Sequence, residues 1–312
     1  MTVDVWALWV EPAGWNFPPT VVVGCAMAAV LYVRGARSTG PAGLRAPGQD
    51  GPMEAGAAAE RAAQQRWRTF SFLGGLLVFV VAVSSPIDRL AQLLFWVHMT
   101  QHLLLWAVVA PLVVLGAPWQ PVWRGLPGSA RRALSTAATR PPLGSVCKVA
   151  RNGLRRPAVC YLLFVAGTWL WHLPALFDLA LRNPLVHEYG EHLTFLVVGV
   201  ILWSQIIGSP PLQPTLGYAG RVAYVGAVIV QNVALAMIIG FAPVPLYAPY
   251  AHLLTRPGGI SALADQRIGA GIMWTAGDLP FSIAISLLVQ RWFAQQERAG
   301  RPTSNFECPG IP

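Results

Sequence analysis

Long apolar runs alternate with shorter polar or Pro- and Gly-rich stretches along most of the sequence. A run of about 20 apolar residues is long enough to cross the ~30 Å hydrocarbon layer of a membrane as an α-helix. Seven such runs predict seven membrane-spanning helices, at about residues 17–33, 67–84, 92–116, 157–173, 185–207, 220–241 and 266–292. We therefore expect an all-α integral membrane protein in which residues 17–293 form one seven-helix bundle.

The composition agrees with a membrane protein. Hydrophobic residues make up 54% of the chain and charged residues 11%, whereas soluble domains carry about 25% charged residues. The formal net charge of +9 would suggest nucleic-acid binding in a soluble protein. Here the basic residues gather in particular loops, which membrane topology explains better. We expect membrane lipid as the surrounding partner, and no nucleic acid.

The distribution of Lys and Arg predicts the orientation of the bundle, because cytoplasmic loops are enriched in these residues. With the N-terminus outside and the C-terminus inside, all but four of the 22 Lys and Arg residues fall on the inner side. Residues 1–16 then form an outer tail, 35–66 and 117–156 form inner loops, and 294–312 form a basic inner tail. The Gly-, Ala- and Pro-rich loop 35–66 is expected to be flexible.

Two histidines lie within the third apolar run. His98 and His102 are four residues apart, so their side chains share one face of a helix. Polar groups at membrane depth mark functional sites, and His192, in the first turns of the fifth run, is of the same kind. Imidazole and thioether groups are copper ligands, and Met favours Cu(I). We therefore predict an outward-facing metal site with the candidate ligands His98, His102, His192, Met99 and Met273.

Four more side chains near this site are accessory candidates: His172, His187, Glu188 and Glu191. Glu188 and His192 are four residues apart, and so are His187 and Glu191, so that either carboxylate would fix the tautomer of a ligating imidazole. A histidine at a membrane boundary also serves as an amphipathic anchor, and a buried methionine serves as packing. The anchor interpretation therefore stays open for His172 and His187, and the packing interpretation stays open for Met99 and Met273.

A lone carboxylate, Asp278, lies near the centre of the last apolar run. Placing it there costs nominally ~2.5–3.5 kcal/mol, so it is expected to be protonated, hydrogen-bonded or paired. Pro280 frees a backbone carbonyl one turn earlier. Two interpretations stand side by side, a hydrogen bond that holds two helices together and an accessory role in function.

The sequence lacks the signatures of several enzyme classes. Its four cysteines are widely spaced, without a Cys-x-x-Cys pair. No Gly-rich phosphate loop or nucleophile elbow occurs in a suitable strand–helix context. The pair His98-x-x-x-His102 lacks the Glu of a His-Glu-x-x-His zinc protease. We expect a protein that is not an enzyme.

Several motifs together resemble the multispan CtaG-type cytochrome c oxidase assembly factors. These motifs cover most of residues 85–293, and their combination is more specific than any one of them. They are His98–Leu104, Ala110–Leu112, Leu115–Pro118, Trp171–Asp178, Pro184–His187, Glu191–Phe195 and Asp265–Trp274. His98, His102, His172 and His192 are among the candidate residues that fall within them. The segment 277–280, which contains Asp278, departs from the form typical of the family.

The resemblance implies a seven-span protein of the plasma membrane that matures a haem–copper oxidase through copper supply. Its partners would be subunits of the oxidase and an outer copper donor protein. Two alternatives remain open. One is a membrane protein that binds haem between paired histidines; the other is a proton-coupled transporter of a small solute or metal that uses Asp278.

Overall fold

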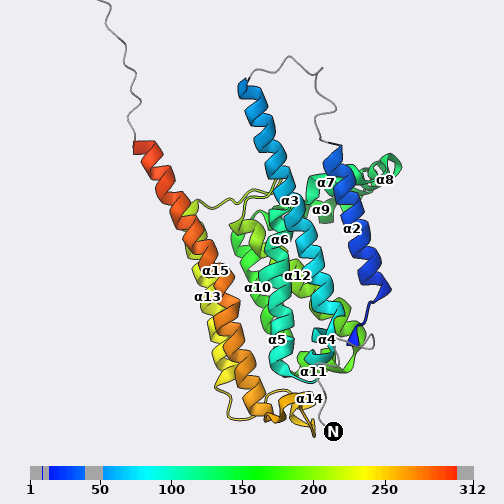
Figure 1. Cartoon of the computed structure of the whole chain (residues 1–312), viewed down its shortest axis with the longest axis vertical. Coiled ribbons are helices and arrows are strands. Elements are labelled where there is room, and N and C mark those ends of the chain that lie inside the picture. Colours follow the sequence, from blue (N-terminus) through cyan, green and yellow to red (C-terminus); the bar gives the residue numbers. More distant parts are fainter. Residues whose placement is uncertain (1–8, 10–13, 39–51, 301–312) are drawn as a thin grey trace, which may run out of the picture.

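The computed structural model describes residue 9, residues 14–38 and residues 52–300 (Figure 1). Within these residues every named element is a helix, which confirms the predicted all-α class. Most of the predicted outer tail 1–16, the centre of the loop 35–66 and the end of the tail 294–312 lie outside the described residues.

Among the described residues, five helices are long and apolar enough to cross a membrane. They are α2 (Pro19–Arg37), α3 (Pro52–Ser84), the continuous helix Phe95–Leu115, α13 (Tyr218–Gly240) and α15 (Ala262–Gly300). A sixth crossing arises if α10 (Pro157–Trp171) and α11 (Pro174–Arg182) count as one span, although these two are bent by 69°. Several apolar helices of this length are the mark of a multi-pass membrane protein.

Helical structure extends into both predicted inner loops. Because α3 begins at Pro52, the interpretation of 35–66 as a flexible loop is wrong for residues 52–66. Ala, Glu, Arg and Gln dominate this stretch, and these strong helix formers outweigh its one glycine, Gly56. The loop 117–156 contains α7 (Trp119–Gly125), α8 (Gly128–Thr139) and α9 (Leu143–Leu154). At the other end of the chain, α15 continues through the first residues of the predicted tail.

The central helix changes its hydrogen-bond pattern halfway. α5 (Phe95–Leu103) and α6 (Ala110–Leu115) flank a π-helix, η3 (Leu104–Val109). In a π-helix each carbonyl bonds the N–H five residues later, and for Trp106 that residue is Pro111, which has no N–H. The indole Nε1 of Trp203 donates to the Trp106 carbonyl instead, at 2.8 Å. Because Pro111 cannot donate, the Trp106 carbonyl is free to link the central helix to α12 (Leu193–Ile206) through this hydrogen bond.

The central helix packs against α3, α12 and α15 (Figure 1). Gly199 of α12 permits the close approach to η3, because a Cβ atom at this position would lie 2.9 Å from Cα of Trp106. The ring of Phe281 from α15 stacks on Trp106 and on Trp203, with centroid separations of 5.6 Å and 5.1 Å. Aromatic stacking adds to the burial of these large side chains. This core fixes the relative positions of the helices that carry the candidate residues.

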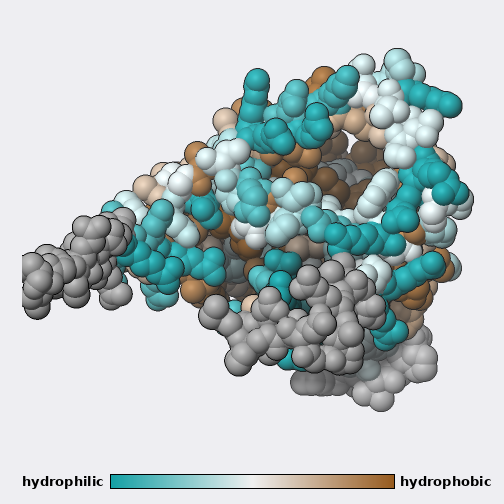
Figure 2. Space-filling view, turned by 90° about the horizontal axis from the view of Figure 1, so that it is seen from above, coloured by the Kyte–Doolittle hydropathy of each residue, from teal (hydrophilic) through white to brown (hydrophobic). Residues whose placement is uncertain are grey.

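The two ends of the bundle differ in character. α7, α8 and α9 lie toward one end, whereas α4 (Pro86–Ala91), α11 and α14 (Ala248–Ala251) lie at the other (Figure 1). Seen from the first end, hydrophilic residues surround an apolar interior (Figure 2). The basic residues of α8 and α9 are Arg131, Arg132, Lys148 and Arg151.

A candidate metal centre

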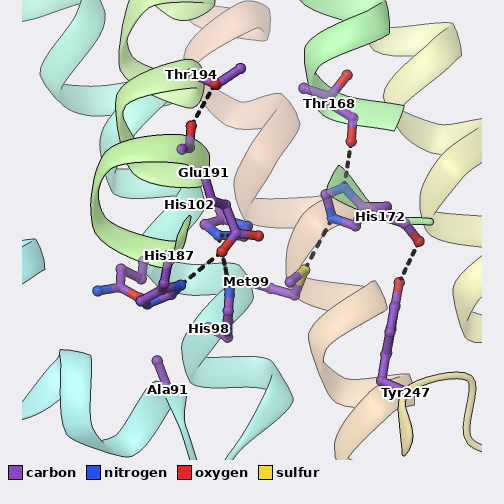
Figure 3. A network of polar contacts seen from close by, with 12 residues as sticks. Ala91, His98, Met99, His102, Thr168, His172, His187, Glu191, Thr194 and Tyr247 are labelled. Carbon is purple, nitrogen blue, oxygen red and sulfur yellow. Dashed lines mark hydrogen bonds and ion pairs between the residues drawn. The ribbon is translucent and has the colours of Figure 1, made fainter. Parts of the chain in front are cut away.

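Five of the six histidines come together toward the end formed by α4, α11 and α14. They are His98, His102, His172, His187 and His192, and all five are buried. The sixth, His252, is exposed. Figure 3 shows His98, His102 and His187 around the carboxylate of Glu191.

His98, His102 and Glu191 form the more deeply buried group. The Nε2 atoms of His98 and His102 lie 2.9 Å apart. The carboxylate oxygens of Glu191 lie 3.5 Å from the first of these nitrogens and 3.4 Å from the second. Ligand atoms placed ~2.0–2.1 Å from a tetrahedral ion are about 3.3 Å from one another. One donor atom from each of the three side chains lies within 4.8 Å of the other two, which is close enough for the three to share one ion.

A chain of hydrogen bonds determines which ring nitrogen of His98 carries the proton. The hydroxyl of Tyr250 donates to the carbonyl of Ala91, so its oxygen accepts from Nδ1 of His98 at 3.0 Å. Burial raises the pKa of the Tyr250 phenol well above its ordinary value, which keeps this proton in place. Assigned from this network, the neutral His98 ring carries its lone pair on Nε2, the atom that faces His102 and Glu191. Proteins orient metal-binding imidazoles in this way.

Glu191 carries a buried carboxylate whose ion pairs, among the described residues, are all with histidine. Nδ1 of His187 donates to Oε2 at 2.8 Å, whereas Oε1 has no hydrogen-bond partner in the described part of the chain. Burying a carboxylate without full compensation is costly. A cation bound beside His98 and His102 would supply the missing compensation.

Asp88, His187 and His192 form a second group, with donor atoms that all lie within 4.8 Å of one another. Asp88 belongs to the short helix α4, and both histidines belong to the π-helix η4 (Val186–His192). Nε2 of His187 is 3.7 Å from Oδ1 of Asp88, and the two imidazole centroids are 4.2 Å apart. The structure thus brings His192 closest to His187, whereas its ring centroid is 6.1 Å from that of His102.

The π-helical turn explains why His187, Glu191 and His192 share one side of η4. In an α-helix, residues five apart point about 140° away from each other, so the two histidines would face different directions. The wider π turn bonds each residue to the one five positions later and brings them into line. π-helical turns are frequent at functional sites.

His172 and Met99 make a separate contact beside the first group. Nδ1 of His172 donates to the carbonyl of Thr168 at 2.7 Å. In the neutral ring this leaves a lone pair on Nε2, which lies 3.4 Å from Sδ of Met99. The hydroxyl of Tyr247 donates to the His172 carbonyl at 3.1 Å and holds the backbone there. A nitrogen and a thioether sulfur side by side are donors that suit Cu(I).

Three of the predicted residues lie apart from these donor groups. Met273 is buried in an apolar cluster with Met99. Its backbone carbonyl accepts a hydrogen bond from Nδ2 of Asn232 at 2.9 Å. Glu188 is partly exposed and makes no hydrogen bond or ion pair through its side chain with another described residue. Asp278 accepts from the same Asn232 amide at 2.9 Å. This contact joins α13 and α15, as the interpretation of Asp278 as a helix-to-helix hydrogen bond expects.

Sequence reasoning missed Asp88 and Tyr250 as parts of the site, and it also missed the role of Asp265. The two carboxylate oxygens of Asp265 accept from the backbone N–H groups of Phe95 and Trp96 at 2.9 Å and 3.0 Å. α5 has no side-chain cap of its own, so this carboxylate from α15 stabilises its N-terminus. Asp is a common helix cap, but no signal in the sequence reveals that it caps a helix 170 residues away.

The sequence profile of the family described as "Cytochrome c oxidase caa3 assembly factor" matches residues 54–295, which include every donor residue above. No solved structure matches the chain significantly.

Three mycobacterial proteins are similar to the chain. An uncharacterized protein of Mycobacterium bovis and one of Mycobacterium tuberculosis are each 29% identical over 253 residues, which is 78% of this chain and 37% of the relative. An uncharacterized protein of Mycobacterium leprae is 29% identical over 238 residues, with 74% and 35% covered. The chain therefore spans little more than a third of the length of the curated relatives it matches.

Proposed function

Because the chain belongs to the cytochrome c oxidase caa3 assembly factor family, we propose that it aids the assembly of a haem–copper oxidase by holding copper as cargo. The copper position consists of Nε2 of His98, Nε2 of His102 and the carboxylate of Glu191. The protein catalyses no reaction in this role. Its partners are subunits of the oxidase and an outer protein that donates copper.

One observation carries the proposal. Three buried side chains from two different helices converge: the Nε2 atoms of His98 and His102 lie 2.9 Å apart, and the two oxygens of Glu191 lie 3.5 Å from the first nitrogen and 3.4 Å from the second, respectively. Two imidazole nitrogens at hydrogen-bond distance share at most one proton, and the lone pair of His98 already points between its two neighbours. A cation satisfies all three donors at once, whereas a single proton satisfies only two of them.

The donor types favour copper among the first-row divalent ions. For a given set of nitrogen and oxygen ligands, affinity rises through the series from Mn²⁺ to Cu²⁺ and falls again at Zn²⁺. Met99 adds a sulfur donor beside the imidazole of His172. The centroid of this imidazole is 6.1 Å from that of His102, so the sulfur lies close to the copper position. Met273, in the same apolar cluster as Met99, is a second thioether within the bundle. Reduced copper would be held through these softer groups.

We place seven spans in the plasma membrane, with the N-terminus outside and the C-terminus inside. η4 and α12 follow each other with helical dihedrals at Leu193 (φ −65°, ψ −38°). Together they run from Val186 to Ile206 and supply a span that neither is long enough to make alone. The positive-inside rule directs the basic end with α8 and α9 to the cytoplasm, so the histidine cluster faces outward.

Elemental analysis of the detergent-purified chain tests the proposal. Copper bound by the wild-type chain is expected to be lost from the buried position in His102→Ala. His252→Ala, which changes the exposed histidine outside the cluster, is the matched control and should keep the wild-type copper content. In cells, His102→Ala should lower oxidase copper and oxidase activity while the protein stays in the membrane. Unchanged oxidase activity in that strain would sink the proposal.

The same measurement addresses the two alternatives. Bis-histidine haem needs two imidazoles on opposite sides of a flat macrocycle. Here the Nε2 atoms of His98 and His102 touch, and aromatic rings fill the adjacent space, with Phe177 4.8 Å from the first imidazole and Phe195 4.2 Å from the second. Iron with a Soret absorption band would nevertheless move haem ahead of copper. The transporter alternative uses Asp278 as the titrating group. The carboxylate of Asp278 instead accepts a hydrogen bond from the Asn232 amide, which gives this residue a structural role.

A further inference from the structure

The second donor group lies on the outer side of the buried one. The side chain of Asp88 is 17% exposed, whereas those of Glu191 and His98 are 0% exposed. Asp88 lies on α4, at the same end of the bundle as α11 and α14 (Figure 1). An ion that entered from this end would therefore meet Asp88 before it met His98 or His102.

The outer group contains buried imidazole nitrogens that lack hydrogen-bond partners among the described residues. His187 donates its Nδ1 proton to Glu191, so in the neutral ring its lone pair lies on Nε2. Nε2 of His187 and Nε2 of His192 are both buried, and neither has a hydrogen-bond partner in the described part of the chain. Unsatisfied buried nitrogens are costly, and a bound ion is one of the few ways to satisfy both.

The carboxylate of the outer group is held in place by a contact of its own. Nε2 of Gln101 donates to Oδ1 of Asp88 at 2.9 Å and also to the carbonyl of Ala82 at 2.9 Å. Gln101 is fully buried, and it lies one residue before His102 on α5. The helix that carries the buried donors therefore also orients the outer carboxylate.

His187 and Glu191 connect the two groups. One nitrogen of His187 faces Asp88 at 3.7 Å, and the other bonds Glu191, whose same oxygen lies 3.5 Å from Nε2 of His98. The imidazole centroids of His98 and His187 are 5.1 Å apart. An ion can therefore pass between the groups by exchanging one ligand at a time, without leaving protein donors.

We propose that Asp88, His187 and His192 form a second, outer cation position, through which copper reaches the buried position of His98, His102 and Glu191. This inference rests on the proposed function. Two histidines and one carboxylate suit a divalent first-row ion, and Cu²⁺ is the tightest binder of such a set. Held copper is thus divided between an entry position and a storage position.

The test titrates Cu²⁺ into the full-length chain in detergent and counts bound copper by elemental analysis after gel filtration. The wild-type chain is expected to hold two copper ions. Asp88→Asn and His192→Gln should each hold one, and so should His102→Ala. The control for Asp88→Asn is Asp178→Asn, which changes a carboxylate that pairs with Arg182 outside both groups, and it should hold two. Electron paramagnetic resonance should show a magnetically coupled Cu²⁺ pair in the wild type and an isolated Cu²⁺ signal in the Asp88 variant.

The outcomes separate this inference from the proposed function. One copper in the wild type, lost in His102→Ala and unaffected by Asp88→Asn and His192→Gln, overturns the outer position and leaves the copper-cargo role intact. No copper in the wild type overturns both. If Asp88→Asn fails to give a monodisperse, helical protein, the count for His192→Gln and the spectrum of the wild type decide the question.

Discussion

Glu191 accepts a hydrogen bond from Nδ1 of His187, 2.8 Å away and one turn earlier on the same π-helix. The carboxylate of Glu191 therefore contacts both donor groups: it accepts from His187 of the outer group, and its oxygens also face the Nε2 atoms of His98 and His102. Any change at Glu191 should therefore disturb both donor groups at once.

Glu191→Gln should weaken copper binding strongly while keeping the volume of the side chain. The amide carries no charge, and its NH₂ group points a donor at nitrogens that need a shared cation. Loss of an outer partner that orients a metal-binding imidazole typically costs about 10–100-fold in metal affinity. Because Glu191 also faces the ion itself, we expect at least that loss in a competition titration with a copper chelator.

Glu188→Gln is the matched control for this change. Glu188 belongs to the same π-helix but is partly exposed and makes no ion pair with another described residue. Its variant should bind copper as the wild type does. Equal losses in the two variants would mean that the charge of η4 as a whole, rather than the position of Glu191, governs binding.

The sequence predicts the five long apolar helices of the described residues, but it gives no sign of the π-helical turns. The run 220–241 corresponds to α13 (Tyr218–Gly240), because apolarity over this length leaves few alternatives to a membrane helix. The π turn of η3 instead depends on where the Trp106 carbonyl finds a donor, and Trp203 supplies it from a distant part of the chain. Local patterns contain no information on such a contact.

The same distinction applies to the site. The four-residue spacing of His98 and His102 predicts that they share one helix face, and their Nε2 atoms lie 2.9 Å apart. His187 and His192 lie five apart, and α-helical geometry separates such residues, so only the π turn brings them together. Asp88 and Tyr250 come from short helices outside the long spans, and their places follow from tertiary packing.

Tyr250→Phe should lower copper affinity about tenfold and should lower the stability of the protein by about 1 kcal/mol. The variant removes the oxygen that accepts from Nδ1 of His98, so the ring is free to move its proton to Nε2 and lose its ligand lone pair. A copper titration in the presence of a competing chelator measures the change.

Tyr247→Phe provides the comparison. Tyr247 stacks in the same aromatic cluster, but its hydroxyl donates to the backbone of His172 rather than to an imidazole. Each variant loses one buried hydroxyl, so their stabilities should fall by similar amounts, about 1 kcal/mol. Only Tyr250→Phe should change copper affinity. A similar affinity loss in both would show that packing, and not the His98 tautomer, is responsible.

Asp265→Ala should destabilise the protein by about 2 kcal/mol, since it leaves the N–H groups of Phe95 and Trp96 unpaired and removes a favourable charge from the start of α5. Asp265→Asn keeps one carbonyl oxygen and should lose about half as much. Thermal unfolding in detergent, followed by circular dichroism, measures both. Equal stability of Asp265→Ala and the wild type would contradict the capping role.

Asp278→Asn should leave copper content, oxidase assembly and stability close to those of the wild type. Asn keeps an oxygen that can accept from Nδ2 of Asn232, so the link between α13 and α15 survives without the titratable group. Asp278→Leu cannot accept this hydrogen bond and should lose between about 0.6 kcal/mol, the average for hydrogen bonds between membrane helices, and about 1.7 kcal/mol, the maximum. Copper content and thermal unfolding of the two variants separate the roles. If Asp278→Asn abolished oxidase assembly at wild-type stability, the carboxyl proton itself would be required, and a proton-coupled function would replace the structural role assigned to this residue.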